Sequence, residues 1–447
     1  MNERIHRLRQ ESLAARESLS PERAMLVTDF YRSGIAQKAS VPVQRARCFK
    51  HILENKSLWL GEGEVIVGER GPSPKATPTY PEICIHSETD LEMIQTREKV
   101  SFAVSAETRA AYRETVIPFW SGKSIRERIF EEVPDDWKAA YRSGVFTEFQ
   151  EQRAPGHTVL GDVIYRKGFS DLKQEIDEAL AGLDYFSDPG AYARKQQLSA
   201  MAIAADALMA YARRYADLLE ERAAVEVDPG RREELRQMGR ICRRVPARAP
   251  RTFWEALQYY WFVHVGVITE LNPWDSFNPG RLDQHLYPFY RRETAAGTLT
   301  RERARELLSA FWIKFNNHPS PPKTGVTAKE SNTYTDFALV NLGGLTREGD
   351  DGANELSYLI LDVVQEMRLL QPSAMVQLSR KNPDRLLKRA LRIVKTGYGQ
   401  PSIFNTDSIV QELVRQGKTL EDAREGGASG CVESGAFGRE AYFLTGY

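Results

Sequence analysis

The residue types best suited to chemistry lie in a glycine-rich stretch at residues 426–435, which reads GGASGCVESG. It places one thiol, Cys431, two residues before one carboxylate, Glu433. In an extended chain alternate side chains share a face, so the two groups are expected to lie side by side. The glycines allow tight bends and a close approach of the backbone to a ligand. The pattern therefore fits a reactive cysteine beside an acid–base group, although a buried, inert cysteine in a glycine-rich turn would fit it as well.

The surroundings of Cys431 argue against one common use of a cysteine. A cysteine protease pairs its nucleophile with a histidine, and no histidine follows Cys431 in the sequence, although an upstream one could fold against it. The other cysteines, Cys48, Cys84 and Cys242, are isolated from one another. Neither a CxxC metal site nor a dense disulfide framework is therefore expected.

The segment 430–433, Gly-Cys-Val-Glu, resembles the active-site cysteine loop of the glycyl radical enzymes, whose eliminases and decarboxylases follow the cysteine with Val-Glu. Residues 68–71, 272–280 and 396–401 are similar to segments at corresponding positions of that family, so the resemblance covers nearly the whole chain. One departure is the single cysteine, where the pyruvate formate-lyases carry two adjacent ones. The resemblance implies a ten-stranded α/β barrel, built from two five-stranded halves and surrounded by helices, with the cysteine on a loop tip inside the barrel.

The same resemblance implies how the reaction is started. The family stores a radical on a glycine near the C-terminus, in an Arg-Val-x-Gly-Tyr-like motif, and neither Gly397 nor Gly446 has that context. The chain also ends in an apolar run, residues 440–447, which is unusual for a terminus. We therefore expect the N-terminal part of a longer protein, without the C-terminal glycyl radical domain and inactive on its own. The resemblance further implies no bound cofactor or metal, a radical-SAM activating enzyme as partner, and a homodimer.

Within the family, the resemblance is strongest to members that dehydrate trans-4-hydroxy-L-proline. Their pocket pattern is matched in residue type at Phe149, His157, Asp275, Ser331, Asp336, Phe337, Cys431 and Glu433. The match implies that Cys431, as a thiyl radical, removes a hydrogen atom from C5 of the substrate. Glu433, His157 and Asp275 complete the catalytic set, because loss of the C4 hydroxyl needs an acid–base group. The implied products are pyrroline-5-carboxylate and water.

The other matched residues are expected to bind the substrate. Asp336, together with Asp275, could hold the ring ammonium by charge-assisted hydrogen bonds. Ser331 could bond the carboxylate, while Phe149 and Phe337 enclose the ring and exclude water. Each of these residues alone would also fit a structural role, so the expectation rests on their joint match to one pattern.

Other functions remain open. The loop 434–438 resembles that of the glycyl radical arylacetate decarboxylases, and a C–S lyase of a small sulfonate fits equally. The glycerol and choline eliminases fit less well, because they usually continue the cysteine loop as Val-Glu-Pro, whereas Ser434 follows Glu433 in this chain. From another class, a metal-dependent hydrolase could use Asp275, Asp283 and His285, although their spacing matches no standard ligand pattern. A non-catalytic partner that supplies a half-barrel is a further alternative.

Composition narrows the class of protein. The 447 residues carry 61 Lys and Arg against 61 Asp and Glu, a formal charge of zero, which disfavours a general nucleic-acid or anionic-membrane binder. With 42% hydrophobic residues the chain is globular, and no apolar run approaches the ~18–20 residues of a bilayer span. The first residues do not resemble a signal peptide, so a soluble, cytoplasmic protein is expected.

Two regions are expected along the chain, both belonging to the N-terminal part of one pyruvate formate-lyase-like catalytic domain. Residues 1–250 are mostly helical, and residues 251–447 carry the barrel strands and the cysteine loop. Apolar runs predict strands at 336–342, 374–378 and 401–405, each followed by a helix, and one more strand at 61–68. Residues 423–440 are expected to form a glycine-rich loop. The alternation of strand and helix favours an α/β fold.

Overall fold

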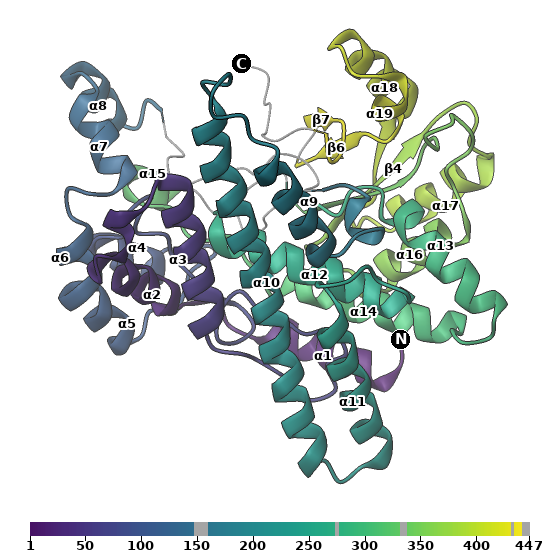
Figure 1. The fold of residues 1–447 in the computed structure, drawn as a ribbon. Coiled ribbons are helices and arrows are strands. Elements are labelled where there is room, and N and C mark those ends of the chain that lie inside the picture. The colour runs from purple at the N-terminus through teal and green to yellow at the C-terminus, as the bar shows by residue number, and fades with distance from the viewer. Residues whose placement is uncertain (147–159, 273–276, 331–337, 431–432, 440–447) are drawn as a thin grey trace.

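Most helices of the first half of the chain lie on one side of the molecule, and the elements that carry the sheet lie on the other (Figure 1). In this computed structural model, residues 1–146, 160–272, 277–330, 338–430 and 433–439 are described. The α-helices up to residue 250 are α1 (Glu3–Ala14), α2 (Glu22–Arg32), α3 (Val41–Asn55), α4 (Glu88–Thr96), α5 (Ala106–Ala111), α6 (Ile117–Trp120), α7 (Ile125–Glu132), α8 (Asp135–Arg142), α9 (Phe169–Ala181), α10 (Ala191–Val225) and α11 (Pro229–Arg244). Short 3₁₀ turns lie at η1 (Ile35–Lys38) and η3 (Val163–Tyr165), a π-helical turn at η2 (Tyr112–Val116), and two paired two-residue strands at β1 (Ser18–Leu19) and β2 (Ala76–Thr77).

The second half alternates helices with strands. Its helices are α12 (Phe253–Glu270), α13 (Leu282–Ala295), α14 (Arg301–Asn316), α15 (Gly325–Glu330), α16 (Glu355–Met367), α17 (Asp384–Val394), α18 (Thr406–Arg415) and α19 (Leu420–Arg424). Three parallel strands, β3 (Leu339–Gly343), β4 (Ser373–Leu378) and β5 (Ser402–Asn405), form one sheet in that order. Helices α16 and α17 make the crossovers that parallel strands require.

The three strands lie close to where the sequence predicts them. All five residues of β3 are buried, as expected for a parallel strand covered on both faces. Leu339 of β3 pairs with Ser373 of β4, and Met375 of β4 pairs with Ser402 of β5. The sheet and its helices therefore form an α/β unit in the part of the chain where barrel strands are expected.

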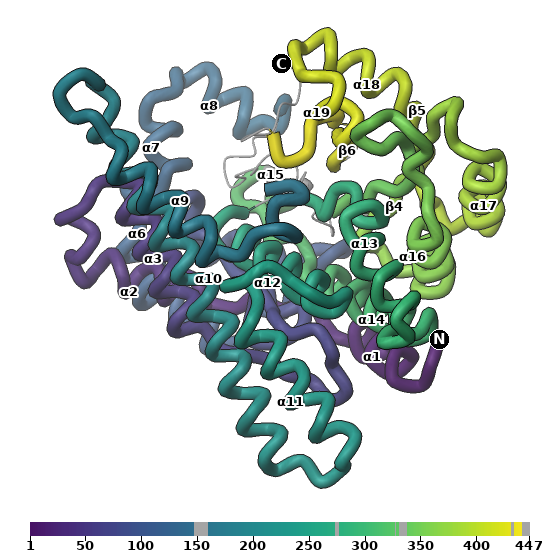
Figure 2. The backbone as a smooth tube through the Cα atoms, turned by 45° about the vertical axis from the view of Figure 1, so that its right-hand side comes forward, coloured from purple at the N-terminus to yellow at the C-terminus, as the bar shows by residue number. Residues whose placement is uncertain are grey.

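A long helical pair marks the first half. Helix α10 packs on α3 and runs beside α11, and the two lie side by side in both Figure 1 and Figure 2. Helix α11 begins where Asp228 caps it, accepting from the Arg231 backbone N–H, with Pro229 at the first helical position. Helix α12 lies at the centre, and all its side chains except Trp254, Val267 and Glu270 are buried. A helix that is apolar on all sides is expected in such a position.

The prediction of a strand at 61–68 is wrong. The backbone there is bonded to side chains of α12 in place of a neighbouring strand. Gln258 donates from Nε2 to the Val67 carbonyl at 2.8 Å and accepts the Val67 N–H at 2.9 Å, while Trp261 Nε1 donates to the Gly68 carbonyl at 2.8 Å. The apolar run is buried, which its composition indicates, but its hydrogen bonds go to a helix. In the described part of the chain, no helix has both the length and the apolar character needed to cross a bilayer.

Candidate active site

The glycine-rich stretch expected as a loop folds in part as a hairpin. Strand β6 (Gly427–Ser429) pairs antiparallel with β7 (Glu433–Gly435), with Ser429 opposite Glu433. We call residues 427–435 the cysteine hairpin, because Cys431 lies between its two strands in the sequence. Glu433 is half-buried at the start of β7. The hairpin fixes the backbone on both sides of the cysteine, which a free loop would not do.

Two side-chain amides of the parallel sheet hold the first strand of the hairpin. Asn341 of β3 donates from Nδ2 to the Ala428 carbonyl at 2.9 Å and accepts the Ala428 N–H at 3.1 Å. Gln377 of β4 donates from Nε2 to Asn341 Oδ1 and to the Gly426 carbonyl, both at 3.1 Å. A Cβ at Gly427 would lie 2.3 Å from an amide atom of each of these side chains, so only glycine fits there unless they move.

A buried arginine links the C-terminal end of β3 to the residues that directly precede the hairpin. Arg281 donates to the Gly343 and Leu345 carbonyls at 2.6 and 2.7 Å, and to the Arg424 and Gly426 carbonyls at 2.5 and 3.3 Å. Its side chain is 2% exposed, and burial lowers the pKa of Arg281 to about 10. One guanidinium thus satisfies carbonyls of two segments that are far apart in the sequence.

Seven of the eight expected site residues fall outside the described ranges. Lying outside the described residues are Phe149, His157, Asp275, Ser331, Asp336, Phe337 and Cys431. Their described neighbours do converge. The Gly280 carbonyl accepts from the Asn341 N–H at 3.0 Å, Asn341 holds Ala428, and a Cβ at Gly438 would lie 2.6 Å from the Gly161 nitrogen. The described segments next in sequence to His157, Asp275, Asp336, Phe337 and Cys431 therefore meet around the cysteine hairpin.

The residues that hold the hairpin are not among those expected from the sequence. Asn341 and Gln377 are polar residues that interrupt the apolar runs of β3 and β4, and both are buried, at 0% and 1% exposure. That interruption of an apolar run is the signal that could have singled them out, because a buried amide needs hydrogen-bond partners. For Arg281 the sequence offers no comparable signal.

A second buried charged cluster holds the segment 64–70. Lys314 Nζ lies 3.0 Å from Glu64 Oε1 and also donates to Glu69 Oε1, while His318 Nε2 lies 2.6 Å from Glu69 Oε2. Burial alone would raise the pKa of Glu69, but Lys314 and His318 lower it to about 2. Burial raises the pKa of Glu64 and lowers that of His318 to about 4. Arg70, next in the chain, donates to the Pro319 carbonyl.

Of the three residues of the alternative metal site, Asp283 is engaged in other contacts. Asp283 accepts the Gly343 N–H at 2.8 Å and the Ser357 hydroxyl at 2.5 Å, and burial raises the pKa of Asp283 to about 6. Burial lowers the pKa of His285 to about 4. Asp275 is outside the described residues. Within the described ranges, no three His, Cys, Asp or Glu side chains form a group that could hold a metal ion.

The three described cysteines are buried. Burial raises the pKa of the Cys48 and Cys242 thiols well above the ordinary value, which suppresses thiolate formation. Cys84 lies 2.7 Å from the Thr324 hydroxyl. These thiols therefore fit structural roles.

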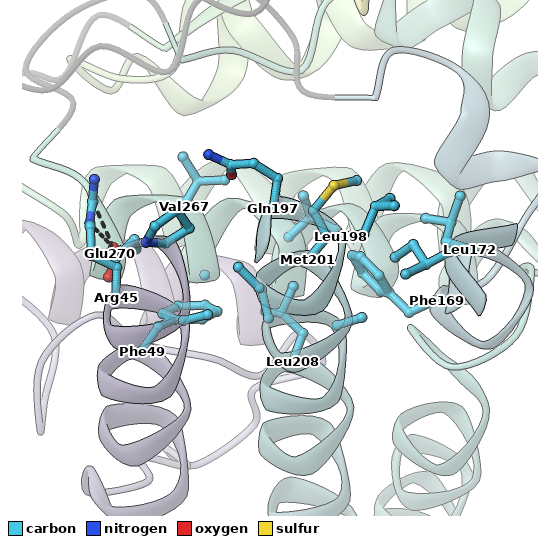
Figure 3. A pocket seen from close by; sticks show the side chains of 18 of the residues that line it. Arg45, Phe49, Phe169, Leu172, Gln197, Leu198, Met201, Leu208, Val267 and Glu270 are labelled. Atoms are coloured by element: carbon cyan, nitrogen blue, oxygen red, sulfur yellow. Dashed lines mark hydrogen bonds and ion pairs between the residues drawn. The ribbon is translucent and has the colours of Figure 1, made fainter. Parts of the chain in front are cut away.

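An apolar cavity of about 670 Å³ lies between α3, α9, α10 and α12 (Figure 3). Its walls include Phe49, Phe169, Leu172, Met201, Leu208 and Val267. Three charged residues, Arg45, Glu175 and Glu270, also line it, and Arg45 pairs with Glu270 at 2.7 Å. The lining shares no residue with the cysteine hairpin, so we do not assign this cavity to the site.

Comparison with known proteins identifies the family. Residues 1–447 match the model described as pyruvate formate lyase-like. The curated trans-4-hydroxy-L-proline dehydratase of Clostridioides difficile is 53% identical over 445 residues, which cover 100% of this chain and 56% of the relative. Isethionate sulfite-lyase of Nitratidesulfovibrio vulgaris is 29% identical over 451 residues, covering 99% of this chain and 54% of the relative.

A solved structure agrees with the sequence matches. The crystal structure of hydroxyproline dehydratase from Clostridioides difficile, with its substrate trans-4-hydroxy-L-proline bound, matches with a TM-score of 0.96 and 52% identity. The match covers 100% of this chain and 56% of that chain, so the present chain spans about half the length of the relatives it matches. The expected fold class, the α/β fold of the glycyl radical enzymes, is confirmed by this match. The chain belongs to the pyruvate formate lyase-like family.

Proposed function

We propose that the whole protein containing this chain is a glycyl radical lyase that dehydrates trans-4-hydroxy-L-proline to pyrroline-5-carboxylate and water. The observation that carries the proposal is the level of identity along the whole chain. It is 53% with the hydroxyproline dehydratase and 29% with the isethionate sulfite-lyase. The cysteine hairpin adds support, because its paired strands hold the backbone on both sides of Cys431. Glu433 is the first residue of the second strand, β7.

The chemistry follows from the two residues of the hairpin. The family's glycyl radical supplies the unpaired electron, and Cys431 as a thiyl radical takes a hydrogen atom from C5, forming its S–H bond and leaving a radical beside C4. Glu433 protonates the departing C4 hydroxyl, so that the C–O bond breaks and water leaves. The ring nitrogen of the substrate then gives up a proton to the Glu433 carboxylate, which restores the carboxylic acid of Glu433. Cys431 finally gives its hydrogen atom to C4, where the radical now lies; its S–H bond breaks, the thiyl radical forms again, and the net change is the loss of one water.

The remaining candidates position the substrate in this proposal. His157 is a second acid–base group near the C4 hydroxyl. Asp275 and Asp336 hold the ring ammonium. Phe149 and Phe337 enclose the ring and exclude water, so that the polar contacts act at low dielectric.

A further residue and a partner complete the proposal. Ser331 bonds the substrate carboxylate. The radical is protein-based, held on a glycine that the 447 residues do not include, and a radical-SAM activating enzyme installs it. We propose that the whole protein works as a cytoplasmic homodimer without a bound cofactor or metal.

A substrate panel tests the proposed function. The whole protein, activated under anaerobic conditions, is supplied separately with trans-4-hydroxy-L-proline, isethionate and a hydroxyarylacetate. We expect consumption of hydroxyproline alone, and no consumption by the Cys431→Ser variant. Release of sulfite from isethionate, or of carbon dioxide from the arylacetate, without dehydration of hydroxyproline would overturn the proposal in favour of the corresponding lyase.

A further inference from the structure

We propose that Asn341 and Gln377 are positioning residues of the radical reaction, because their side-chain amides set where the cysteine hairpin presents Cys431 and Glu433. The inference rests on the proposed function, in which these two hairpin residues react with the substrate. Neither amide is assigned a contact with the substrate.

The hairpin depends on side chains for its attachment to the sheet. A two-stranded hairpin with three residues in each strand is marginally stable alone. In the described part of the chain, no backbone hydrogen bond joins β6 or β7 to β3, β4 or β5. The join passes through Asn341, whose amide bonds both the N–H and the carbonyl of Ala428, as a neighbouring strand would.

Gln377 fixes the direction of that amide. Its Nε2 donates to Asn341 Oδ1, which leaves Asn341 Nδ2 to face the Ala428 carbonyl. The same Nε2 donates to the Gly426 carbonyl, one residue before the hairpin. Gln377 is in turn contacted by the Thr406 hydroxyl at 3.4 Å. Strands β3 and β4 therefore hold the hairpin through one chain of amides.

The packing leaves little room for this arrangement to shift. Asn341 and Ala428 are fully buried, Gln377 is 1% exposed, and the space at Gly427 is filled by the two amides. A change in either amide is consequently passed to the backbone of β6. Glu433 pairs with Ser429, the C-terminal residue of β6, and this is the strand pair nearest to Cys431 in the sequence.

A displaced thiol is expected to slow the reaction more than it weakens binding. The residues proposed to bind the substrate are carried by other segments, while the hydrogen transfer needs near contact between Cys431 and C5. A misplacement of about 1 Å can reduce a rate by about 100-fold. For Asn341→Ala we therefore expect kcat to fall by about 10- to 100-fold, with KM within about threefold of the wild type.

The test compares variants of the whole, activated protein. For each variant kcat, KM, the glycyl radical content by electron paramagnetic resonance and the thermal midpoint are measured. Asn341→Asp keeps an acceptor for the Ala428 N–H and should retain more of kcat than Asn341→Ala. Asn354→Ala is the matched control, since that side chain caps α16 through the Leu356 and Ser357 N–H groups; it should lower the thermal midpoint without changing kcat per radical.

The coupling between the two amides gives a second readout. Because Gln377 acts largely through Asn341, Gln377→Ala should lower kcat clearly in the wild type and much less in the Asn341→Ala background. A selective loss of kcat per radical, with this non-additivity, would support the proposal. It would be overturned by wild-type kcat per radical in Asn341→Ala, or by a loss shared equally by Asn354→Ala.

The design separates this inference from the proposed function. If the wild type does not consume hydroxyproline, the proposed function fails, and the variants are compared on the panel substrate that the wild type does consume. If the wild type dehydrates hydroxyproline and the Asn341 and Gln377 variants do so at the same rate per radical, the positioning role alone fails.

Discussion

Two buried carboxylates that share one lysine should respond very differently to the same substitution. Glu69 gains from ionisation in the folded protein, because Lys314 and His318 overcome its burial and lower its pKa to about 2 from an ordinary 4.5. Each tenfold change in proton affinity is worth about 1.4 kcal/mol. Glu69→Gln should therefore cost about 3 kcal/mol of unfolding free energy at pH 7.

Glu64 contacts the same Lys314 ammonium group, but its pKa shifts in the opposite direction. Burial raises its pKa, so its ionised form gains no stability from folding. In Glu64→Gln the amide oxygen can still accept the Gly61 N–H, which lies 2.9 Å from the carboxylate now. We expect this variant to lose about 1 kcal/mol or less.

Urea unfolding of the whole protein, followed by circular dichroism, measures both variants against the wild type. The advantage of the wild type over Glu69→Gln is fully present above about pH 4.5 and is lost as the pH falls through about 2, because the folded-state pKa of Glu69 is the lowered one. Equal losses for the two variants at pH 7, or a larger loss for Glu64→Gln, would refute this account of the cluster.

Three further results are expected. Gly427→Ala should cost about 1–3 kcal/mol in urea unfolding, since its Cβ would lie 2.3 Å from amide atoms of Asn341 and Gln377, and an unchanged midpoint would contradict that packing. Glu433→Gln should lower kcat of the activated whole protein by about 100-fold or more at unchanged radical content, whereas wild-type turnover would remove its acid–base role. Burial lowers the pKa of His318 from 6.5 to about 4. Between these pH values the unfolded chain takes up a proton that the folded protein does not, so the free energy of unfolding should fall by up to about 3 kcal/mol as the pH drops from 6.5 to 4. Urea midpoints at a series of pH values should show this slope and its reduction in His318→Gln; parallel slopes would contradict it.

The parts of the fold with strong local patterns could be predicted from the sequence. Apolar runs located the strands that became β3, β4 and β5, each within about three residues of its observed ends. At 61–68 the same kind of run did not form a strand, because its backbone bonds to side chains of α12 about 190 residues away, and no local pattern carries that information.

The candidate site divides in the same way. Cys431 and Glu433 could be singled out by their spacing and their resemblance to a known loop. The residues that hold that loop could not, since Asn341 lies 87 residues before Ala428 and Arg281 143 residues before Arg424. Such contacts depend on the tertiary fold. The roles of Phe149, His157 and the other candidates outside the described residues stay predictions.

The most direct test of the account is mass spectrometry of the activated whole protein with trans-4-hydroxy-L-proline. The account predicts a product lighter by one water, formed by the wild type and absent in Cys431→Ser, with the glycyl radical visible by electron paramagnetic resonance in both. Water loss that persists in Cys431→Ser, or no water loss from a wild type that carries the radical, would contradict the central claim that the cysteine hairpin presents the thiol that dehydrates hydroxyproline.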